Sequence, residues 1–229
     1  MSITKMIAGR FTNYDDRESA GSRFRAKRIG LLLEMMKVVH AEHGLVNVID
    51  IGGTEQYWKI VPEDFLREFN VKITIVNLPG TATQKDHDFF TFTEADGCDL
   101  TSIHDKSFHI AHSNSVVEHV GDWERMTRFA REVSRVSQRY FVQTPNYWFP
   151  IEPHFMTPFI HWLPRPMRVW LVLRFALGNM SKANSVDQAV RIVESARLLN
   201  KKMFAELFKD ADVTTETYLG LSKSFIATR

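Results

Sequence analysis

VIDIGGTEQYW, from Val48 to Trp58, is the stretch that decides the fold. An apolar, strand-like run carries the acid Asp50 near its end, Gly52 and Gly53 follow, and the next segment can begin a helix. In open α/β sheets, ligands bind beyond the carboxyl ends of the strands, where a helix N-terminus offers free N–H groups. The stretch therefore predicts a ligand site at this turn. A glycine turn that serves only chain reversal is the alternative interpretation.

The glycine pattern limits the kind of ligand. A dinucleotide site favours G-x-G-x-x-G, but here only Gly52 and Gly53 are present, and Tyr57 stands where the later glycine is expected. A ligand with a carboxylate and an ammonium group but no pyrophosphate does not require the full three-glycine pattern. The turn can meet the carboxylate, and Asp50 or a nearby carbonyl can meet the ammonium.

Short strand-like runs alternate with helical patterns along most of the chain. Apolar side chains recur at helical spacing in Arg17 to His43 and again from Val116 to Val133. This alternation predicts an α/β fold, a Rossmann-like and mostly parallel sheet with helices on both faces. The expected strands are 45–51, 71–78, 89–95, 107–114 and 139–146, followed by an antiparallel terminal hairpin of 213–219 and 222–229.

The stretch between Pro145 and Asp210 interrupts the alternation and is interpreted as a helical insertion before the last hairpin. Prolines and aromatic residues crowd its beginning, and a long helix is expected from Val186 to Phe208. Insertions at the carboxyl edge of such a sheet usually build the substrate side of a site. We expect a single domain, 1–229, that consists of an N-terminal helical cover (1–44), a cofactor-binding core (45–144), an insertion or acceptor lid (145–211) and the hairpin (212–229).

Composition excludes several classes of protein. The 29 Lys and Arg against 27 Asp and Glu give a net charge of +2, which is too small to indicate a nucleic-acid-binding protein. The one cysteine, Cys98, excludes an intramolecular disulfide framework and fits a reducing compartment. Neither a secretory signal nor an apolar run of transmembrane length is apparent, so a cytoplasmic chain is expected. The nine histidines form no H-x-x-x-H or H-E-x-x-H pattern, and no metal site is predicted.

Residues 165–178 mix basic and large apolar side chains. Arg165, Arg168 and Arg174 lie beside Trp170 in a segment that can form a helix. Such a helix can lie at an anionic membrane surface or against a lipid tail. A solvated helix face, or a helix packed on the sheet domain, is the plainer alternative.

Four segments taken together resemble the class I S-adenosylmethionine-dependent methyltransferases, in particular the broad small-molecule group called type 11. They are VIDIGGT, ITIVNLP, EADGCDL and DKSFHIAHSNSVVEHVGDW, and their order and spacing are similar to the family's. The resemblance covers roughly Leu45 to Asn146 and the terminal hairpin. It implies S-adenosyl-L-methionine as the cofactor.

The resemblance also implies which residues meet each part of that cofactor. The first turn would hold the methionine part, the end of the second strand the ribose, the following turn the adenine edge, and the end of the fourth strand the sulfonium side. In that order these residues are Asp50, Gly52, Gly53 and Thr54; Asn77 and Leu78; Asp96, Gly97 and Cys98; and Ser113, Asn114 and Ser115. The family usually has an acid where Asn77 stands, and an amide can still hydrogen-bond a diol, though without a charge.

The acceptor side is assigned from residue chemistry. His154, with Glu152 two residues before it, can serve as a general base, and so can His119. Trp148 can stack on an acceptor beside Glu152 and His154. For each histidine the alternative is structural: His119 pairs locally with Glu118, and His154 orders a proline-rich loop.

These observations predict methyl transfer to an oxygen or nitrogen of a small metabolite, or of one linked to a lipid or a sugar. The expected partner is this small-molecule acceptor and not a nucleic acid. A catalytically silent methyltransferase-like binding subunit is one alternative, favoured by Asn77. Another Rossmann-type nucleotide binder is the third, disfavoured by the missing glycine.

Overall fold

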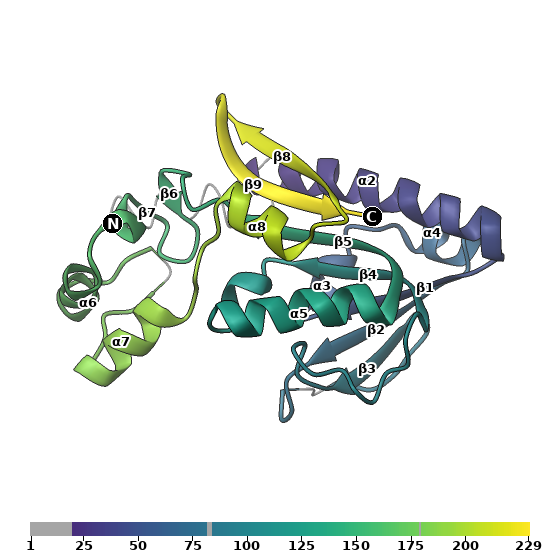
Figure 1. Cartoon of the computed structure of the whole chain (residues 1–229), viewed down its shortest axis with the longest axis horizontal. Helices are drawn as coiled ribbons and strands as arrows, with labels where there is room; N and C mark the ends of the chain where they lie inside the picture. The colour runs from purple at the N-terminus through teal and green to yellow at the C-terminus, as the bar shows by residue number, and fades with distance from the viewer. Residues whose placement is uncertain (1–19, 82–83, 179) are drawn as a thin grey trace.

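The computed structural model of the protein describes residues 20–81, 84–178 and 180–229. One seven-stranded sheet has the order β3-β2-β1-β4-β5-β9-β8 (Figure 1). The first five strands are parallel, β9 is antiparallel to β5, and β8 is antiparallel to β9. The strands are β1 (Val46–Ile51), β2 (Val71–Asn77), β3 (Phe90–Glu94), β4 (Phe108–Asn114), β5 (Ser137–Pro145), β8 (Asp212–Tyr218) and β9 (Leu221–Thr228). The predicted fold class and terminal hairpin are confirmed.

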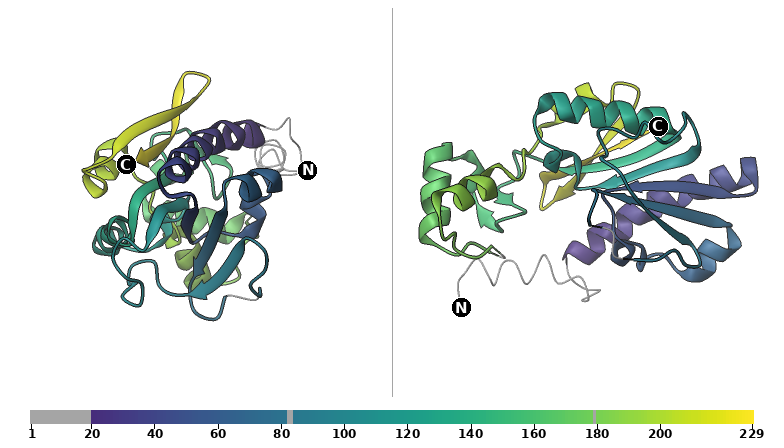
Figure 2. Two further views of the ribbon diagram at one scale, coloured as in Figure 1. Left: turned by 90° about the vertical axis from the view of Figure 1, so that its right-hand side faces the viewer. Right: turned by 90° about the horizontal axis from the view of Figure 1, so that it is seen from below.

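Helices cover both faces of this sheet (Figures 1 and 2). One face packs against α2 (Ala20–His43), α3 (Glu55–Trp58) and α4 (Glu63–Glu68). The other face packs against α5 (Trp123–Val136) and α8 (Lys201–Leu207). Within the sheet, Phe141 of β5 belongs to the first layer, while its neighbours Tyr140 and Val142 belong to the second. This alternation follows from the period of two of a strand, so that each sheet face contributes to its own apolar core.

The insertion forms a separate body beside the carboxyl edge of the sheet, as Figures 1 and 2 show. It contains β6 (Ile151–Glu152), β7 (Thr157–Pro158), the 3₁₀ turn η2 (Ile160–Trp162), α6 (Arg165–Arg174) and α7 (Val186–Glu194). Its apolar side chains form a third core, distinct from the two that cover the sheet: Phe155, Ile160, Val172, Ala183, Ala189 and Val193. Helix α6 therefore packs within the insertion, mainly on α7, and not on the sheet domain.

The single long helix predicted from Val186 to Phe208 is wrong. The structure has two helices, α7 and α8, separated by residues 195–200. The Asn200 side chain accepts a hydrogen bond from the N–H of Met203 at 3.0 Å and so caps a new helix start. Leu199 is fully buried and forms a bridge with Asn146, which holds the linking segment extended at the sheet edge. Tertiary contacts thus override the helical spacing of the apolar residues.

The N-terminal helix is described from Ala20, so the first residues expected in it, 17–19, lie outside the described residues. Ile29, Leu32, Met36 and Val39 are buried on one side of α2, as their spacing predicts. Among the helices of the described ranges, none combines the length and the apolar character that crossing a bilayer requires.

Candidate functional site

The residues predicted for the cofactor lie at the carboxyl edge of the parallel strands. Register pairs Asp50 of β1 with Ile75 of β2 and with His112 of β4, so these three strands end side by side. β3 pairs with β2 on the far side from β1, and the loops that follow β1, β2, β3 and β4 carry every residue of the predicted set except Asp50, Asn77, Ser113 and Asn114, which stand in the strands themselves. The structure thus gathers the set at one edge, while the contact of each residue with a ligand stays a prediction.

The glycine pair has local structural reasons of its own. Gly52 has φ +75°, a left-handed conformation, and a Cβ there would lie 2.7 Å from the Val116 side chain. A Cβ on Gly53 would lie 1.7 Å from a carboxylate oxygen of Asp50. Both positions therefore need glycine for the turn to close over Asp50. Packing alone accounts for the two glycines, so the chain-reversal interpretation stays open.

Asp50 is fully buried beneath this turn. Its Oδ2 accepts a hydrogen bond from Trp58 Nε1 at 2.7 Å, and its Oδ1 lies 2.7 Å from His112 Nδ1. The protein itself therefore uses both carboxylate oxygens. In this arrangement Asp50 supports the turn from inside, and a cofactor would meet the backbone above it.

Asn77 ties the second strand to the same turn. Its Nδ2 donates to the carbonyl oxygen of Gly53 at 3.0 Å, so its amide orients the glycine loop and leaves Oδ1 as the group that could face a ribose. The N–H groups of Gly53 and Thr54 have no acceptor within the described part of the chain, as a cofactor carboxylate would require. Leu78, the next residue, is 56% exposed.

The turn predicted for the adenine edge is held by Arg125 from α5. Asp96 accepts from Arg125 at 2.7 Å and from the N–H of Cys98 at 2.9 Å. Partial burial would raise the pKa of Asp96, but these two hydrogen bonds outweigh burial and lower it. A Cβ on Gly97 would lie 2.8 Å from Ile51, so the turn packs directly on the end of β1.

The end of β4 is anchored to three different elements. Ser113 donates to the carbonyl oxygen of Ile51, and the Ser115 hydroxyl lies 2.9 Å from Gln143 of β5. Asn114 accepts a hydrogen bond from Arg28 of α2. Arg28 also forms a buried ion pair with Glu216 of β8 at 2.7 Å. These contacts connect the N-terminal helix and the hairpin to the strand end.

A chain of polar contacts then runs from the insertion to the sheet edge. Glu152 Oε1 lies 2.6 Å from His154 Nδ1, and His154 Nε2 lies 2.9 Å from His119 Nε2. His119 Nδ1 lies 2.7 Å from the carbonyl oxygen of Ser195. Burial alone would lower the pKa of His154, but the Glu152 carboxylate and the charge of Glu118 reverse this and raise it. Burial lowers the pKa of His119.

Glu118, beside His119, is 1% exposed and faces the same chain of contacts. Its Oε2 accepts from the Thr144 hydroxyl at 3.0 Å, and its Oε1 is buried without a hydrogen-bond partner in the described part of the chain. Burial raises the pKa of Glu118 to about 7. Ligand atoms of Glu118, His119 and His154 all lie within 4.8 Å of one another. Neither H-x-x-x-H nor H-E-x-x-H describes this cluster, because His154 follows His119 by 35 residues and belongs to the insertion, whereas His119 follows a strand of the sheet.

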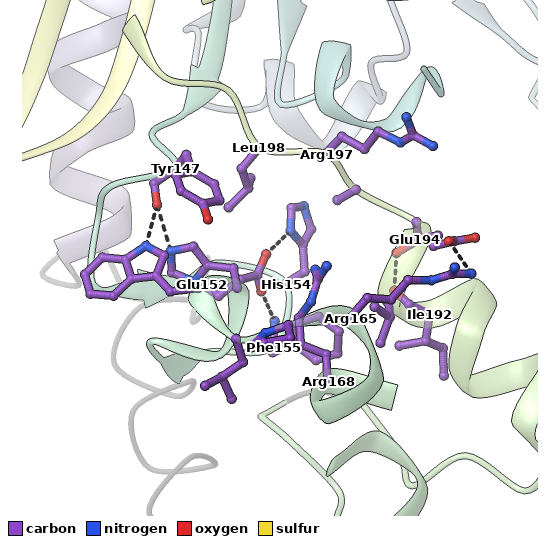
Figure 3. A pocket seen from close by; sticks show the side chains of 17 residues that line it. Tyr147, Glu152, His154, Phe155, Arg165, Arg168, Ile192, Glu194, Arg197 and Leu198 are labelled. Carbon is purple, nitrogen blue, oxygen red and sulfur yellow. Dashed lines mark hydrogen bonds and ion pairs between the residues drawn. The ribbon is translucent and has the colours of Figure 1, made fainter. Parts of the chain in front are cut away.

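A cavity of about 520 Å³ opens beside this cluster, within the insertion (Figure 3). Figure 3 shows Glu152 reaching both His154 and the backbone N–H of Phe155 at the cavity wall. Of the residues predicted for the acceptor, Glu152 and His154 line the cavity. Trp148 does not line it: that side chain is 61% exposed and packs edge-on against Tyr147.

No family model matches the chain, and no curated protein matches it in sequence. Among solved structures, the DszA carbon methyltransferase has a TM-score of 0.55 at 9% identity, over 92% of this chain and 55% of that one. A Rhodobacter sphaeroides protein described as a Zn-dependent alcohol dehydrogenase has a TM-score of 0.50 at 11% identity, over 80% of this chain and 83% of that one. A SAM-dependent methyltransferase from Methanosarcina mazei has a TM-score of 0.46 at 16% identity, over 83% of this chain and 95% of that one.

At these identities the likenesses concern the fold alone. The parallel five-stranded core and the antiparallel terminal hairpin are those expected from the resemblance in sequence, and the DszA likeness spans nearly the whole chain. The chain has the Rossmann-like fold of the class I S-adenosylmethionine-dependent methyltransferases.

Proposed function

We propose that this chain transfers a methyl group from S-adenosylmethionine to an oxygen or nitrogen atom of a small molecule. The observation that carries the proposal is the position of the polar cluster. Ser113 to Ser115, predicted to meet the sulfonium side, lead directly into Glu118 and His119, and His119 Nε2 lies 2.9 Å from His154 Nε2 at the cavity wall. The predicted donor side and the cavity thus adjoin along one short stretch of chain.

The reaction needs little covalent chemistry from the protein. The positive sulfur already activates the methyl group, so the protein's task is to align donor and acceptor in line and to exclude water. An acceptor hydroxyl or amine also profits from a general base. His154 suits this role because the Glu152 carboxylate at 2.6 Å orients the ring and favours its protonated form. An acceptor would compete with His119 for the Nε2 atom of His154.

Calorimetry tests the cofactor part directly. We expect binding of S-adenosylmethionine and of its demethylated product, and no binding of NAD. Binding of NAD alone would favour another nucleotide binder. Cofactor binding without label transfer from methyl-labelled donor to any component of a cell extract would favour the silent binding subunit.

Two variants test the acceptor assignment. His154→Asn should lower turnover at least tenfold, about 1.4 kcal/mol, while cofactor affinity stays within twofold of the wild type. Trp148→Ala tests the predicted stacking contact; because this exposed side chain does not line the cavity, turnover should stay within twofold if the acceptor binds in the cavity, and a tenfold loss would place the acceptor outside it. Trp123→Ala, which removes an exposed tryptophan on α5, is the matched control and should change neither quantity. Loss of cofactor affinity together with turnover in His154→Asn would contradict the assignment.

A further inference from the structure

The two imidazole rings of the cluster direct lone pairs at the same point. The Ser195 carbonyl oxygen can only accept, so His119 Nδ1 at 2.7 Å must carry a hydrogen, and the neutral ring then has its lone pair on Nε2. The Glu152 Oε1 atom, 2.6 Å from Nδ1, accepts a hydrogen bond from His154 in the same way and imposes the same tautomer. The two Nε2 atoms nevertheless face each other at 2.9 Å.

Two facing lone pairs repel unless a positive charge lies between them. Either one ring carries an additional proton, or a cation binds both nitrogens. The Oε1 atom of Glu118, which has no hydrogen-bond partner among the described residues, favours the second explanation, because a proton shared by the two rings would leave this buried oxygen unsatisfied. Buried carboxylate oxygens usually have a partner, and a cation would serve Glu118 and both rings together.

We propose that Glu118, His119 and His154 bind one divalent cation of the zinc class. Two imidazoles and a carboxylate are a common ligand set for zinc, and hydrogen bonds from the second ring nitrogens to a carboxylate and a backbone carbonyl are the usual support of such ligands. Glu152 and Ser195 supply these two supports here. The cation site is argued from ligand atoms alone, but it uses the Nε2 atom that the proposed function assigns to the general base. A cation bound there would exclude base catalysis by His154 while leaving the proposed cofactor site unchanged.

The geometry requires a small adjustment. Zinc–nitrogen bonds are about 2.0–2.1 Å long, so two nitrogens on a tetrahedral ion lie roughly 3.3–3.4 Å apart. The rings, at 2.9 Å, must therefore separate by roughly half an ångström. Three protein ligands leave one coordination position open. Since His154 and Ser195 line the cavity, the ion would lie at its wall.

A second histidine pair in the chain lacks these features and provides a control. His43 and His109, at the amino end of the sheet, stack face to face with centroids 4.5 Å apart and ring planes at 14°. His109 Nδ1 accepts a hydrogen bond from the N–H of Asn47 at 3.0 Å, which occupies one lone pair. Stacked rings do not direct their nitrogens at a common point.

The test is a titration of the whole chain with Zn²⁺ by calorimetry after removal of metals with a chelator. His119→Asn and His154→Asn keep a donor for Ser195 and for Glu152 but remove the Nε2 atoms, and Glu118→Gln keeps the shape and removes the charge. We expect one ion per wild-type chain, binding at least tenfold weaker in each of these variants, and a change below twofold in His43→Ala. With Co²⁺ we expect the visible absorption of a tetrahedral site in the wild type and its loss in the variants.

Melting temperatures without metal establish that each variant is folded. If a variant is not folded, the Co²⁺ spectra of the wild type and of His43→Ala replace it: tetrahedral absorption in both proteins supports the proposal, and its absence from the wild type contradicts it. Absence of zinc binding to the wild type would overturn the proposal and leave a shared proton as the explanation of the short contact. Zinc binding that the three variants retain, or that His43→Ala removes, would overturn it equally.

Discussion

Removing the Asp50 carboxylate should lower the free energy of unfolding more than it weakens cofactor binding. Asp50→Ala leaves two buried donors, Trp58 Nε1 and His112 Nδ1, without an acceptor. Each orphaned donor costs about 1–3 kcal/mol, so the free energy of unfolding should fall by about 2–6 kcal/mol. That is a large part of the roughly 5–15 kcal/mol that stabilises a typical domain.

Asp50→Asn should be milder, because its carbonyl oxygen can still accept from Trp58. His112 must then move its proton from Nδ1 to Nε2, a buried atom that has no partner in the described part of the chain. We expect a loss of about 1–3 kcal/mol. The exposed Asp99→Asn is the control and should change stability by less than about 0.5 kcal/mol.

Urea unfolding followed by circular dichroism measures these differences, provided that the slope with denaturant is unchanged. Cofactor affinity, measured in parallel, should change little in Asp50→Asn, since both oxygens of the wild-type side chain serve the protein. An Asp50→Ala protein as stable as the wild type would refute the buried hydrogen bonds. An Asp50→Asn protein that keeps its stability but loses cofactor affinity would instead make Asp50 a direct ligand contact.

Three further predictions concern other parts of the molecule. Arg28→Met breaks the buried pair with Glu216 and should lower the free energy of unfolding in urea by about 3–5 kcal/mol. Combining it with Glu216→Leu should recover part of this loss, and a double variant no more stable than the single one would contradict the pairing. Burial raises the pKa of Cys98 to about 11, so the thiol stays protonated at pH 8. Alkylation of Cys98, followed by mass spectrometry, should therefore be much slower in the native protein than in urea, and equal rates would contradict the burial of this thiol. Trp170 is 54% exposed on α6, and if 165–178 contacts lipid, sedimentation with anionic liposomes at low salt should be lost in Trp170→Glu; a wild type that does not sediment ends that prediction.

The sheet could be predicted from the sequence because its signals are local. Each strand is a short apolar run bounded by turn residues, and alternation with helices sets the topology. The helix predicted from Val186 to Phe208 failed where a local signal competed with tertiary contacts. Leu199 fits a helical stripe, but burial at Asn146 and the Asn200 cap favour an extended link and a new helix.

The candidate site could be predicted only in part, for a related reason. Position in a loop after a strand shows that a residue lies at the carboxyl edge, but not what its side chain contacts. Asn77 holds Gly53, and Asp50 is enclosed by Trp58 and His112; both contacts join residues from separate elements. The cluster around His154 likewise arises only when the insertion folds back on the sheet.

The insertion's separate core has a consequence for how this protein can open. Because its apolar side chains pack on one another and not on the two sheet cores, the insertion can unfold locally as a unit while the sheet keeps its cooperative structure. Such an opening would carry His154 away from Glu118 and His119, which stay on the sheet side. Hydrogen exchange should then show that the amides of α6 and α7 open at a lower free energy than those of β1 and β4. The contacts among Glu118, His119 and His154 would therefore depend on the local unfolding equilibrium of the insertion and not on global unfolding.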